Sequence, residues 1–263
     1  MNEIIDSKAI KKAIARITQY AEHSHFQQEI AERLLARLPF MKIQPRRILD
    51  CGGDQFTLQA LQKNYPEAEV VQHPITELNN FAYGAASFDF VFANLSLHWA
   101  EDMFKTLAEF RRLIKQDGLL LFSTLGPDTL TELHQAFLTA EDKWHVHPFM
   151  DMHPIGDEVL RLQFFEPVID MEKVTLHYES LDDLFLDLKN TGTQNALTQR
   201  SRGLQGKNAW QKMLTHYVKT KEGYFPVTAE VIYGQAWVNG PRLSRVGSDN
   251  EVVFSLEDGL PRR

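Results

Sequence analysis

The stretch that decides the fold is Ser87-Phe-Asp-Phe-Val-Phe-Ala-Asn-Leu-Ser-Leu-His-Trp99, followed by Arg111-Arg-Leu-Ile-Lys-Gln-Asp-Gly-Leu-Leu-Leu-Phe-Ser-Thr124. Its pattern predicts a strand, a loop, a helix, a turn and a second strand. The first strand ends on polar residues, the helix is expected to stop at Asp117-Gly118, and the second strand is continuously apolar, as buried parallel strands are. This is typical of a doubly wound α/β sheet that binds a small ligand at the carboxyl ends of its strands. We therefore expect an α/β enzyme.

The segments on either side continue the alternation of strand and helix. Arg46 to Cys51 is expected to be a short buried strand that runs into a tight turn, and a helix is expected from about Phe56. Glu69 to Gln72 fits a second strand, and Asp102 to Ile114 places its apolar residues on one helical stripe. The order strand, helix, strand predicts βαβ units and a parallel sheet.

The rest of the chain is predicted from apolar spacing and turn residues. Helices are expected over 8–20, 26–38, 152–164 and 181–190, and a further helix is expected after Asp128 or Thr129 as its N-cap. Strands are expected over 167–178, as one or two pieces, and over 227–238, as an antiparallel strand at the sheet edge. The segment from Arg200 to Gly206 is expected to be a loop. The polar tail from Asn239 is expected to be poorly ordered.

Composition excludes several functional classes. The formal net charge is -7, and basic residues cluster no further than adjacent pairs, which argues against binding nucleic acid. The single cysteine, Cys51, excludes an intrachain disulfide, and the polar start of the chain does not resemble a secretory signal. No apolar run approaches the roughly 20 residues that span a bilayer. We expect a cytoplasmic protein that binds neither nucleic acid nor membrane.

Several phrases of the chain are shared with one family. These are the run 87–99, Phe110-Arg-Arg-Leu-Ile-Lys, Leu121-Phe-Ser-Thr-Leu-Gly-Pro-Asp-Thr-Leu130, Asp151-Met-His-Pro-Ile-Gly-Asp157, Ala15-Arg-Ile-Thr-Gln-Tyr20 and Arg202-Gly-Leu204. With them the chain resembles the class I S-adenosylmethionine-dependent methyltransferases of biotin synthesis, the malonyl-carrier-protein O-methyltransferases. The resemblance extends over most of the chain. A sister group of similar sequence serves the assembly of respiratory complex I.

The resemblance implies a Rossmann-like class I methyltransferase fold with a helical N-terminal cover and an α/β cap. It suggests a single domain over 1–240, with the cover at 1–40, a cofactor-binding core at 46–127, the cap at 128–221 and a closing strand at 227–238. Residues 241–263 form the tail.

The resemblance also implies a reaction. Family members transfer the methyl group of S-adenosylmethionine to the free carboxylate of a malonyl thioester, on acyl carrier protein or coenzyme A, and so start pimeloyl synthesis for biotin. The carboxylate is already anionic at neutral pH, so catalysis depends mainly on alignment and desolvation rather than on a general base. Two alternatives stay open: a methyltransferase for another carboxylic acid, and a non-catalytic or redirected assembly factor with the same fold.

Site residues follow from matching positions in the family pattern. Tyr20 is expected over the methyl donor, Asn94 around its sulfonium end, and Glu77 near the adenine. Arg200 or Arg202 is expected to bind the malonyl carboxylate, because the planar guanidinium matches a carboxylate better than an ammonium does. Structural alternatives stay open for Tyr20, as a packed tyrosine, and for Arg200 and Arg202, as solvated loop arginines.

The cofactor loop departs from the family pattern. Relatives follow the first strand with Asp-x-Gly-x-Gly-x-Gly, whose backbone cradles the methionine end of the cofactor beside a helix N-terminus. Here the sequence is Asp50-Cys-Gly-Gly-Asp-Gln-Phe-Thr57, about two residues shorter. We expect Asp50, Gly52 and Gly53 to bind the cofactor. The additional Asp54 could hold the methionine amine or repel its carboxylate.

A second departure comes at the end of the next strand. Relatives carry a carboxylate there that accepts both ribose hydroxyls, whereas this chain has Gln72 and His73. Gln72 is expected to make one hydrogen bond to the ribose. Losing the charged acceptor should cost on the order of 1.5–3 kcal/mol of binding free energy.

Three histidines lie close together in the cap, His145, His147 and His153. No companion pair of cysteines or acidic residues at ligand spacing completes a metal site with them. The sequence therefore predicts surface histidines and no bound metal.

Overall fold

The computed structural model describes residues 6, 8–9, 12, 25–140, 145–146, 148–190, 195–196, 198 and 206–238. Within them, β1 (Arg47–Cys51), β2 (Glu69–His73), β3 (Phe88–Ala93), β4 (Ile114–Leu125), β5 (Phe165–Tyr178) and β6 (Phe225–Trp237) form one sheet in the order β2-β1-β3-β4-β6-β5. The first four strands are parallel, and β6 is antiparallel to both of its neighbours. The predicted doubly wound α/β fold is confirmed.

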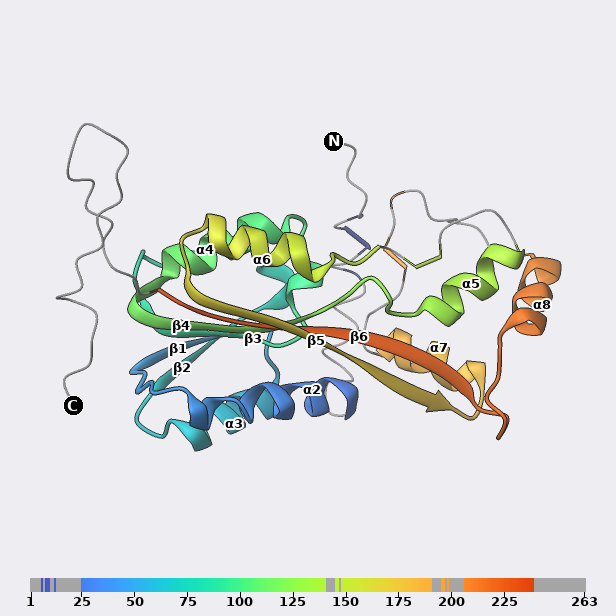
Figure 1. Cartoon of the computed structure of the whole chain (residues 1–263), viewed down its shortest axis with the longest axis horizontal. Helices are drawn as coiled ribbons and strands as arrows, with labels where there is room; N and C mark the ends of the chain where they lie inside the picture. Colours follow the sequence, from blue (N-terminus) through green and yellow to red (C-terminus); the bar gives the residue numbers. More distant parts are fainter. Residues whose placement is uncertain are drawn as a thin grey trace.

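Helices cover both faces of this sheet (Figure 1). On one face lie α2 (His25–Leu35) and α3 (Gln55–Asn64), and on the other lie α4 (Met103–Leu113) and α6 (Met152–Arg161). Each face has its own buried apolar cluster, one with Phe90 and Phe92 and the other with Phe110 and Phe122. Because both faces are buried, the central strands need apolar side chains on both sides, which accounts for their continuous apolar runs.

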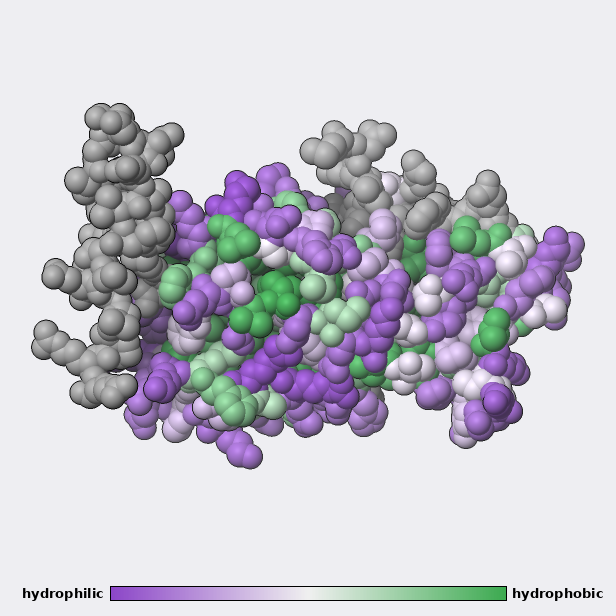
Figure 2. All heavy atoms as spheres, viewed as in Figure 1, coloured by the Kyte–Doolittle hydropathy of each residue, from purple (hydrophilic) through white to green (hydrophobic). Residues whose placement is uncertain are grey.

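The long antiparallel pair of β5 and β6 extends past the parallel strands, as Figure 1 shows, and the surface over this end of the molecule is mostly hydrophilic in Figure 2. Beside its far end lie α5 (Thr131–Ala140), α7 (Leu181–Asn190) and α8 (Lys207–His216). Their apolar residues form a third buried cluster around Leu133, Phe137, Leu184 and Met213, separate from the two that flank the sheet. These helices lie in the segment 128–221 that was predicted as the cap, and the cap itself stays a prediction.

Where α4 passes into β4, the predicted boundary was wrong. The helix ends at Leu113, and the strand already begins at Ile114, so Asp117-Gly118 lies inside the strand. The register between β3 and β4 shifts there, and Asp117 has a φ of 63°. A Cβ on Gly118 would stand 2.5 Å from Cγ2 of Ile114 and 2.7 Å from the carbonyl oxygen of Asp89. The turn residues therefore make a bulge rather than stop a helix.

The start of α5 also differs from the prediction. The helix begins at Thr131, so Leu130, and not Asp128 or Thr129, directly precedes it. Instead, the backbone N–H of Asp128 donates to the buried Glu230 at 2.7 Å, and the Thr129 hydroxyl donates to the carbonyl oxygen of Glu230 at 3.2 Å. The two residues are thus held by a strand about 100 positions away, which no local pattern indicates.

Other element predictions had mixed outcomes. The segment predicted as one or two strands over 167–178 is the single strand β5. The strand predicted at the sheet edge, 227–238, is β6, but β6 pairs with both β4 and β5, so β5 forms the edge. The helix α8 was not predicted, although Trp210, Met213 and Tyr217 have helical spacing. The predicted helix 8–20 lies almost entirely outside the described residues, and the tail 241–263 lies entirely outside them.

Candidate functional site

The carboxyl ends of the parallel strands carry the polar residues of the candidate site. Asp50 is in β1, Asn94 and Ser96 follow β3, and Ser123 is near the end of β4. All four are buried. Because parallel strands end at the same edge of a sheet, these residues lie at one edge although they are up to 73 positions apart in sequence. For Asp50 and Asn94 the sequence predicts this placement.

Asp50 is fully buried beneath the turn that follows β1. Its Oδ2 accepts hydrogen bonds from the Thr57 hydroxyl at 2.8 Å and from the Gln72 amide at 3.2 Å. Its Oδ1 has no hydrogen-bond partner among the described residues. Burial raises the pKa of Asp50 to about 7, and nearby Asp54 adds to this, while the bonds from Thr57 and Gln72 oppose it. The side chain is therefore a buried acceptor that is only half satisfied.

Glycine is required at both positions of the turn. A Cβ on Gly53 would stand 1.9 Å from Oδ2 of Asp50, so the carboxylate occupies the place of a side chain. Gly52 has a φ of 76°, and a Cβ there would stand 2.8 Å from Cβ of Ser96. The hydroxyl of Ser96 is also buried and unpartnered within the described part of the chain. The turn thus joins two polar groups that have unused hydrogen-bonding capacity.

Asp54 begins the helix α3 with a capping box. Its Oδ1 accepts the backbone N–H of Thr57 at 2.9 Å, and the Thr57 hydroxyl accepts the backbone N–H of Asp54 at 2.9 Å. A negative side chain at this helix end is favoured by the helix dipole. The Asp-x-x-Thr spacing is a sequence signal for this role, although Thr57 was not among the predicted site residues. Whether Asp54 also contacts a ligand stays a prediction.

Gln72 and His73 end β2 and point to opposite sides of the sheet, as consecutive strand residues do. Gln72 is exposed, and its Nε2 lies 2.9 Å from the carbonyl oxygen of Asp54 as well as 3.2 Å from Asp50. His73 is buried and stacks on Phe81 with ring centroids 4.3 Å apart. Burial lowers the pKa of His73. Of the two residues that replace the expected ribose carboxylate, only Gln72 faces the turn.

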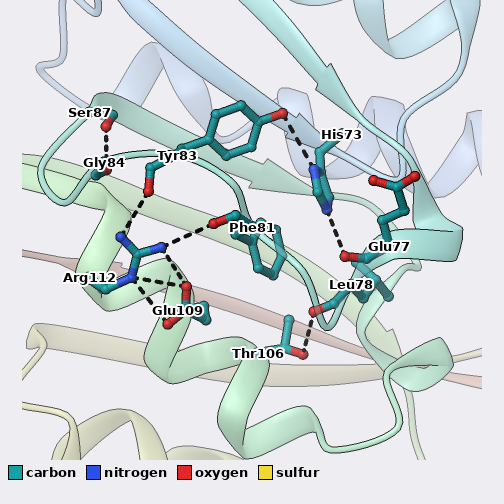
Figure 3. A network of polar contacts seen from close by, with 10 residues as sticks. All are labelled: His73, Glu77, Leu78, Phe81, Tyr83, Gly84, Ser87, Thr106, Glu109 and Arg112. Carbon is teal, nitrogen blue, oxygen red and sulfur yellow. Dashed lines mark hydrogen bonds and ion pairs between the residues drawn. The ribbon is translucent and has the colours of Figure 1, made fainter.

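The segment after β2 packs against α4 through the network in Figure 3. Nε2 of His73 lies 3.0 Å from the carbonyl oxygen of Glu77. Arg112 donates to the carbonyl oxygens of Tyr83 and Phe81 at 2.9 and 3.4 Å and pairs with Glu109. The network holds the backbone that carries Glu77.

The predicted adenine contact, Glu77, ends the short 3-10 helix Ile75–Glu77. Its side chain is exposed, and in Figure 3 the backbone carbonyl oxygen of Glu77, and not its carboxylate, is hydrogen-bonded to the His73 ring. The carboxylate is therefore accessible at this edge of the fold. Its contact with adenine stays a prediction.

Asn94 connects the sheet to the N-terminal cover. Its Nδ2 donates to the carbonyl oxygen of Gln27 in α2 at 3.0 Å, and its Oδ1 accepts from the Ser123 hydroxyl at 2.9 Å. The Ser123 oxygen in turn accepts the backbone N–H of Leu95 at 2.9 Å. Asn94 thus has a structural role that the sequence did not reveal, and its contact with a cofactor stays a prediction.

A mainly apolar cavity of about 60 Å³ lies between this edge, α2 and the cap. Its lining includes Phe26, Gln27, Leu95, His98, Leu125, Thr129, Leu130, Phe149, Leu176, Tyr178, Leu184, Asp187, Leu188, Val227, Thr228 and Ala229. On its wall the Tyr178 hydroxyl donates to Asp187 at 2.6 Å. Burial and then this bond raise the pKa of Tyr178. Sequence patterns did not predict the cavity, because its walls come from distant segments.

Three of the predicted site residues, Tyr20, Arg200 and Arg202, lie outside the described residues. Cys51 is buried, and burial raises the pKa of its thiol, so it packs as a small apolar residue. Across the described part of the chain, no group of three or more His, Cys, Asp or Glu side chains could hold a metal ion. None of the described helices is long and apolar enough to cross a membrane.

Comparison with known proteins adds independent information. Residues 46–122 match the family model described as a methyltransferase domain. A malonyl-(acyl-carrier protein) O-methyltransferase 1 of Coxiella burnetii is 41% identical over 276 residues, covering 98% of this chain and 97% of its own. The corresponding protein of Gallionella capsiferriformans is 38% identical over 280 residues, covering 94% and 97%.

Solved structures support the fold. The crystal structure of the YcgJ protein from Bacillus subtilis aligns with a TM-score of 0.52 at 12% identity, covering 80% of this chain and 99% of that protein. At this identity the likeness concerns the fold alone.

Proposed function

The chain belongs to the malonyl-(acyl-carrier protein) O-methyltransferases, and on this premise we propose that it methylates the free carboxylate of a malonyl thioester carried by acyl carrier protein, at the start of pimeloyl synthesis for biotin. It uses S-adenosylmethionine as the methyl donor. The observation that carries the proposal is similarity over nearly the whole length of the relatives. It includes the cap, which lies beyond the methyltransferase domain of 46–122 and lines the cavity.

The residues at the turn after β1 fit the methionine end of this cofactor. Oδ1 of Asp50 and the hydroxyl of Ser96 are buried polar atoms without partners in the described structure, and both side chains lie against the Gly52-Gly53 turn. The carboxylate can accept from an ammonium group, and the hydroxyl can donate to a carboxylate. When bound, S-adenosylmethionine supplies a methyl group on a positively charged sulfur.

The cavity supports the chemistry of carboxylate methylation. In such a transfer a carboxylate oxygen would bond to the methyl carbon as the carbon–sulfur bond breaks, and the electron pair of that bond would stay on sulfur. Opposite charges are neutralised in this step, so a water-poor, apolar environment favours it. Leu95, Leu130 and Leu184 supply such walls. The chain needs to align the reactants and exclude water, and the nucleophile needs no base.

The cap also carries charge suited to an acidic carrier protein. Lys207 and Lys212 are exposed on α8, and Lys219 and Lys221 are exposed just after it, whereas the chain as a whole is acidic. Complementary charge speeds association and fixes orientation. Arg200 and Arg202 precede this helix in the sequence. We assign the carrier to this side of the cap, with malonyl-coenzyme A as the alternative substrate.

The test is methyl transfer with purified components. Wild-type protein, methyl-labelled S-adenosylmethionine and malonyl-carrier protein should give a labelled methyl ester. Acetyl-carrier protein, which lacks the free carboxylate, should give none. A protein that binds S-adenosylhomocysteine but methylates another acid would overturn the substrate. A folded protein that binds no cofactor would support the assembly-factor alternative instead.

A further inference from the structure

The side chain of Gln72 joins two parts of the cofactor loop that are far apart in sequence. Its Nε2 lies 3.2 Å from Oδ2 of Asp50 in β1 and 2.9 Å from the carbonyl oxygen of Asp54 at the start of α3. Both partners are acceptors, so the amide must present its nitrogen to them, and its two N–H groups match the two bonds. The amide oxygen is left to accept a hydrogen bond on the exposed side.

We propose that Gln72 is a positioning residue that holds Asp50 and the shortened cofactor loop in place, and that its amide is required there in place of a carboxylate. The proposal rests on the use of S-adenosylmethionine and not on the malonyl substrate. It reverses the simple expectation that an acidic residue at this position would improve binding by accepting the ribose hydroxyls.

The electrostatics of the turn support this assignment. A carboxylate at position 72 would place its oxygens against the Asp50 carboxylate and the Asp54 carbonyl oxygen, and it would offer no donor to either. Asp50 is fully buried and already lacks a partner for Oδ1, so it could not move into water to avoid the repulsion. The negatively charged Asp54 also lies close enough to raise the pKa of Asp50. The site therefore favours a neutral donor.

The geometry of the loop explains why the amide reaches both partners. Asp50 is directly opposite Gln72 in the register of β1 and β2. Only Cys51, Gly52 and Gly53 separate Asp50 from Asp54, so α3 begins close to the strand end. The short connection brings the Asp54 carbonyl within 2.9 Å of a side chain on β2. The short loop therefore requires a hydrogen-bond donor at position 72, and the Gln72 amide supplies it.

The test compares Gln72→Glu with Gln72→Met, using calorimetric titration with S-adenosylhomocysteine and thermal unfolding. Both variants should weaken binding about tenfold or more, because both remove the two donors. Gln59→Glu is the matched control, since Gln59 is exposed on α3 and the substitution changes the net charge equally. It should leave binding within about twofold of wild type.

A double variant tests whether repulsion between carboxylates at positions 50 and 72 destabilises Gln72→Glu. Asp50→Asn combined with Gln72→Glu exchanges the amide and the carboxylate, so it should melt at a higher temperature than Gln72→Glu alone. If Gln72→Glu bound S-adenosylhomocysteine as tightly as wild type, or more tightly, Gln72 would be a replaceable ribose acceptor and the proposal would be wrong. Wild-type binding by Gln72→Met would overturn it equally. These titrations use no malonyl substrate, so they are independent of the proposed reaction.

Discussion

The amide of Asn94, just after β3, donates to the main-chain oxygen of Gln27 in α2 at 3.0 Å. This bond fastens the N-terminal cover to the carboxyl edge of the sheet, and Gln27 also lines the cavity. The same amide accepts from Ser123, so one side chain connects α2, β3 and β4. The position of the cavity wall therefore depends on a residue that the sequence suggested only as a ligand.

Removing the two hydrogen bonds of the Asn94 side chain should lower the stability of the protein. Asn94→Ala removes both bonds and leaves the buried Ser123 hydroxyl without its acceptor, so the free energy of unfolding should fall by about 1–3 kcal/mol. Urea unfolding measures this loss. Asn64→Ala is the control, because Asn64 also donates to a carbonyl oxygen but is exposed. Equal losses in the two variants would contradict the role of Asn94.

The buried Asp50 should make stability depend on pH. Its pKa is raised from 3.8 to about 7 in the folded protein, so the folded state holds the proton more tightly than the unfolded chain. Between about pH 4 and pH 7 the free energy of unfolding should therefore fall as pH rises, by on the order of 4 kcal/mol. Asp50→Asn should remove this contribution, so its stability relative to wild type should increase from pH 5 to pH 8.

Urea unfolding at several pH values tests the Asp50 prediction. Asp157→Asn, at an exposed position on α6, should keep the pH dependence of wild type. A constant difference between Asp50→Asn and wild type across this range would show that Asp50 does not titrate there.

Arg112 should stabilise the segment that follows β2. Its planar guanidinium bonds two carbonyl oxygens and Glu109 at once, which the single ammonium of lysine cannot do. Arg112→Lys should lower the free energy of unfolding by about 1–3 kcal/mol. Arg161→Lys serves as the control, since Arg161 pairs with Glu158 at the same helical spacing but is mostly exposed. A similar loss in both would mean that the loop carbonyls contribute little.

The cavity should bind the acyl substrate and not the cofactor. Ala229→Leu adds three carbon atoms to its wall and should lower kcat/KM for malonyl-carrier protein about tenfold or more, because the thioester would be displaced. Binding of S-adenosylhomocysteine should stay within about twofold of wild type, since the methionine end is assigned to the turn after β1. Ala85→Leu, at an exposed position, should change neither quantity. Loss of cofactor affinity alone would place the cofactor in this cavity.

Reversing charge on α8 should affect the carrier selectively. Lys207→Glu combined with Lys212→Glu should raise KM for malonyl-carrier protein about tenfold and leave malonyl-coenzyme A kinetics nearly unchanged. The effect should shrink at high salt, because exposed charges are screened. Lys63→Glu, on the exposed face of α3, is the control. An equal rise in KM for both substrates would argue against carrier docking at this helix.

The sequence by itself determined the core of the fold. Apolar runs such as Phe88–Ala93 must be buried on both faces, so they predicted parallel strands covered by helices. Parallel strands end at one edge, which is why Asp50 and Asn94 could be placed at the site without a structure. The resemblance to the methyltransferase family then indicated the reaction, because this resemblance extends over the cap as well as the core.

Only the tertiary structure decided the contacts between distant segments. No local periodicity encodes which distant residues pair. This holds for the order of β5 and β6 in the sheet, for the bond from the Asp128 backbone to Glu230, and for the bonds from Gln72 to Asp50 and Asp54. Local patterns report which face of an element is buried, but not which other element buries it. The cavity arises in the same way, from walls supplied by α2, the sheet edge and the cap, which meet only when the chain has folded.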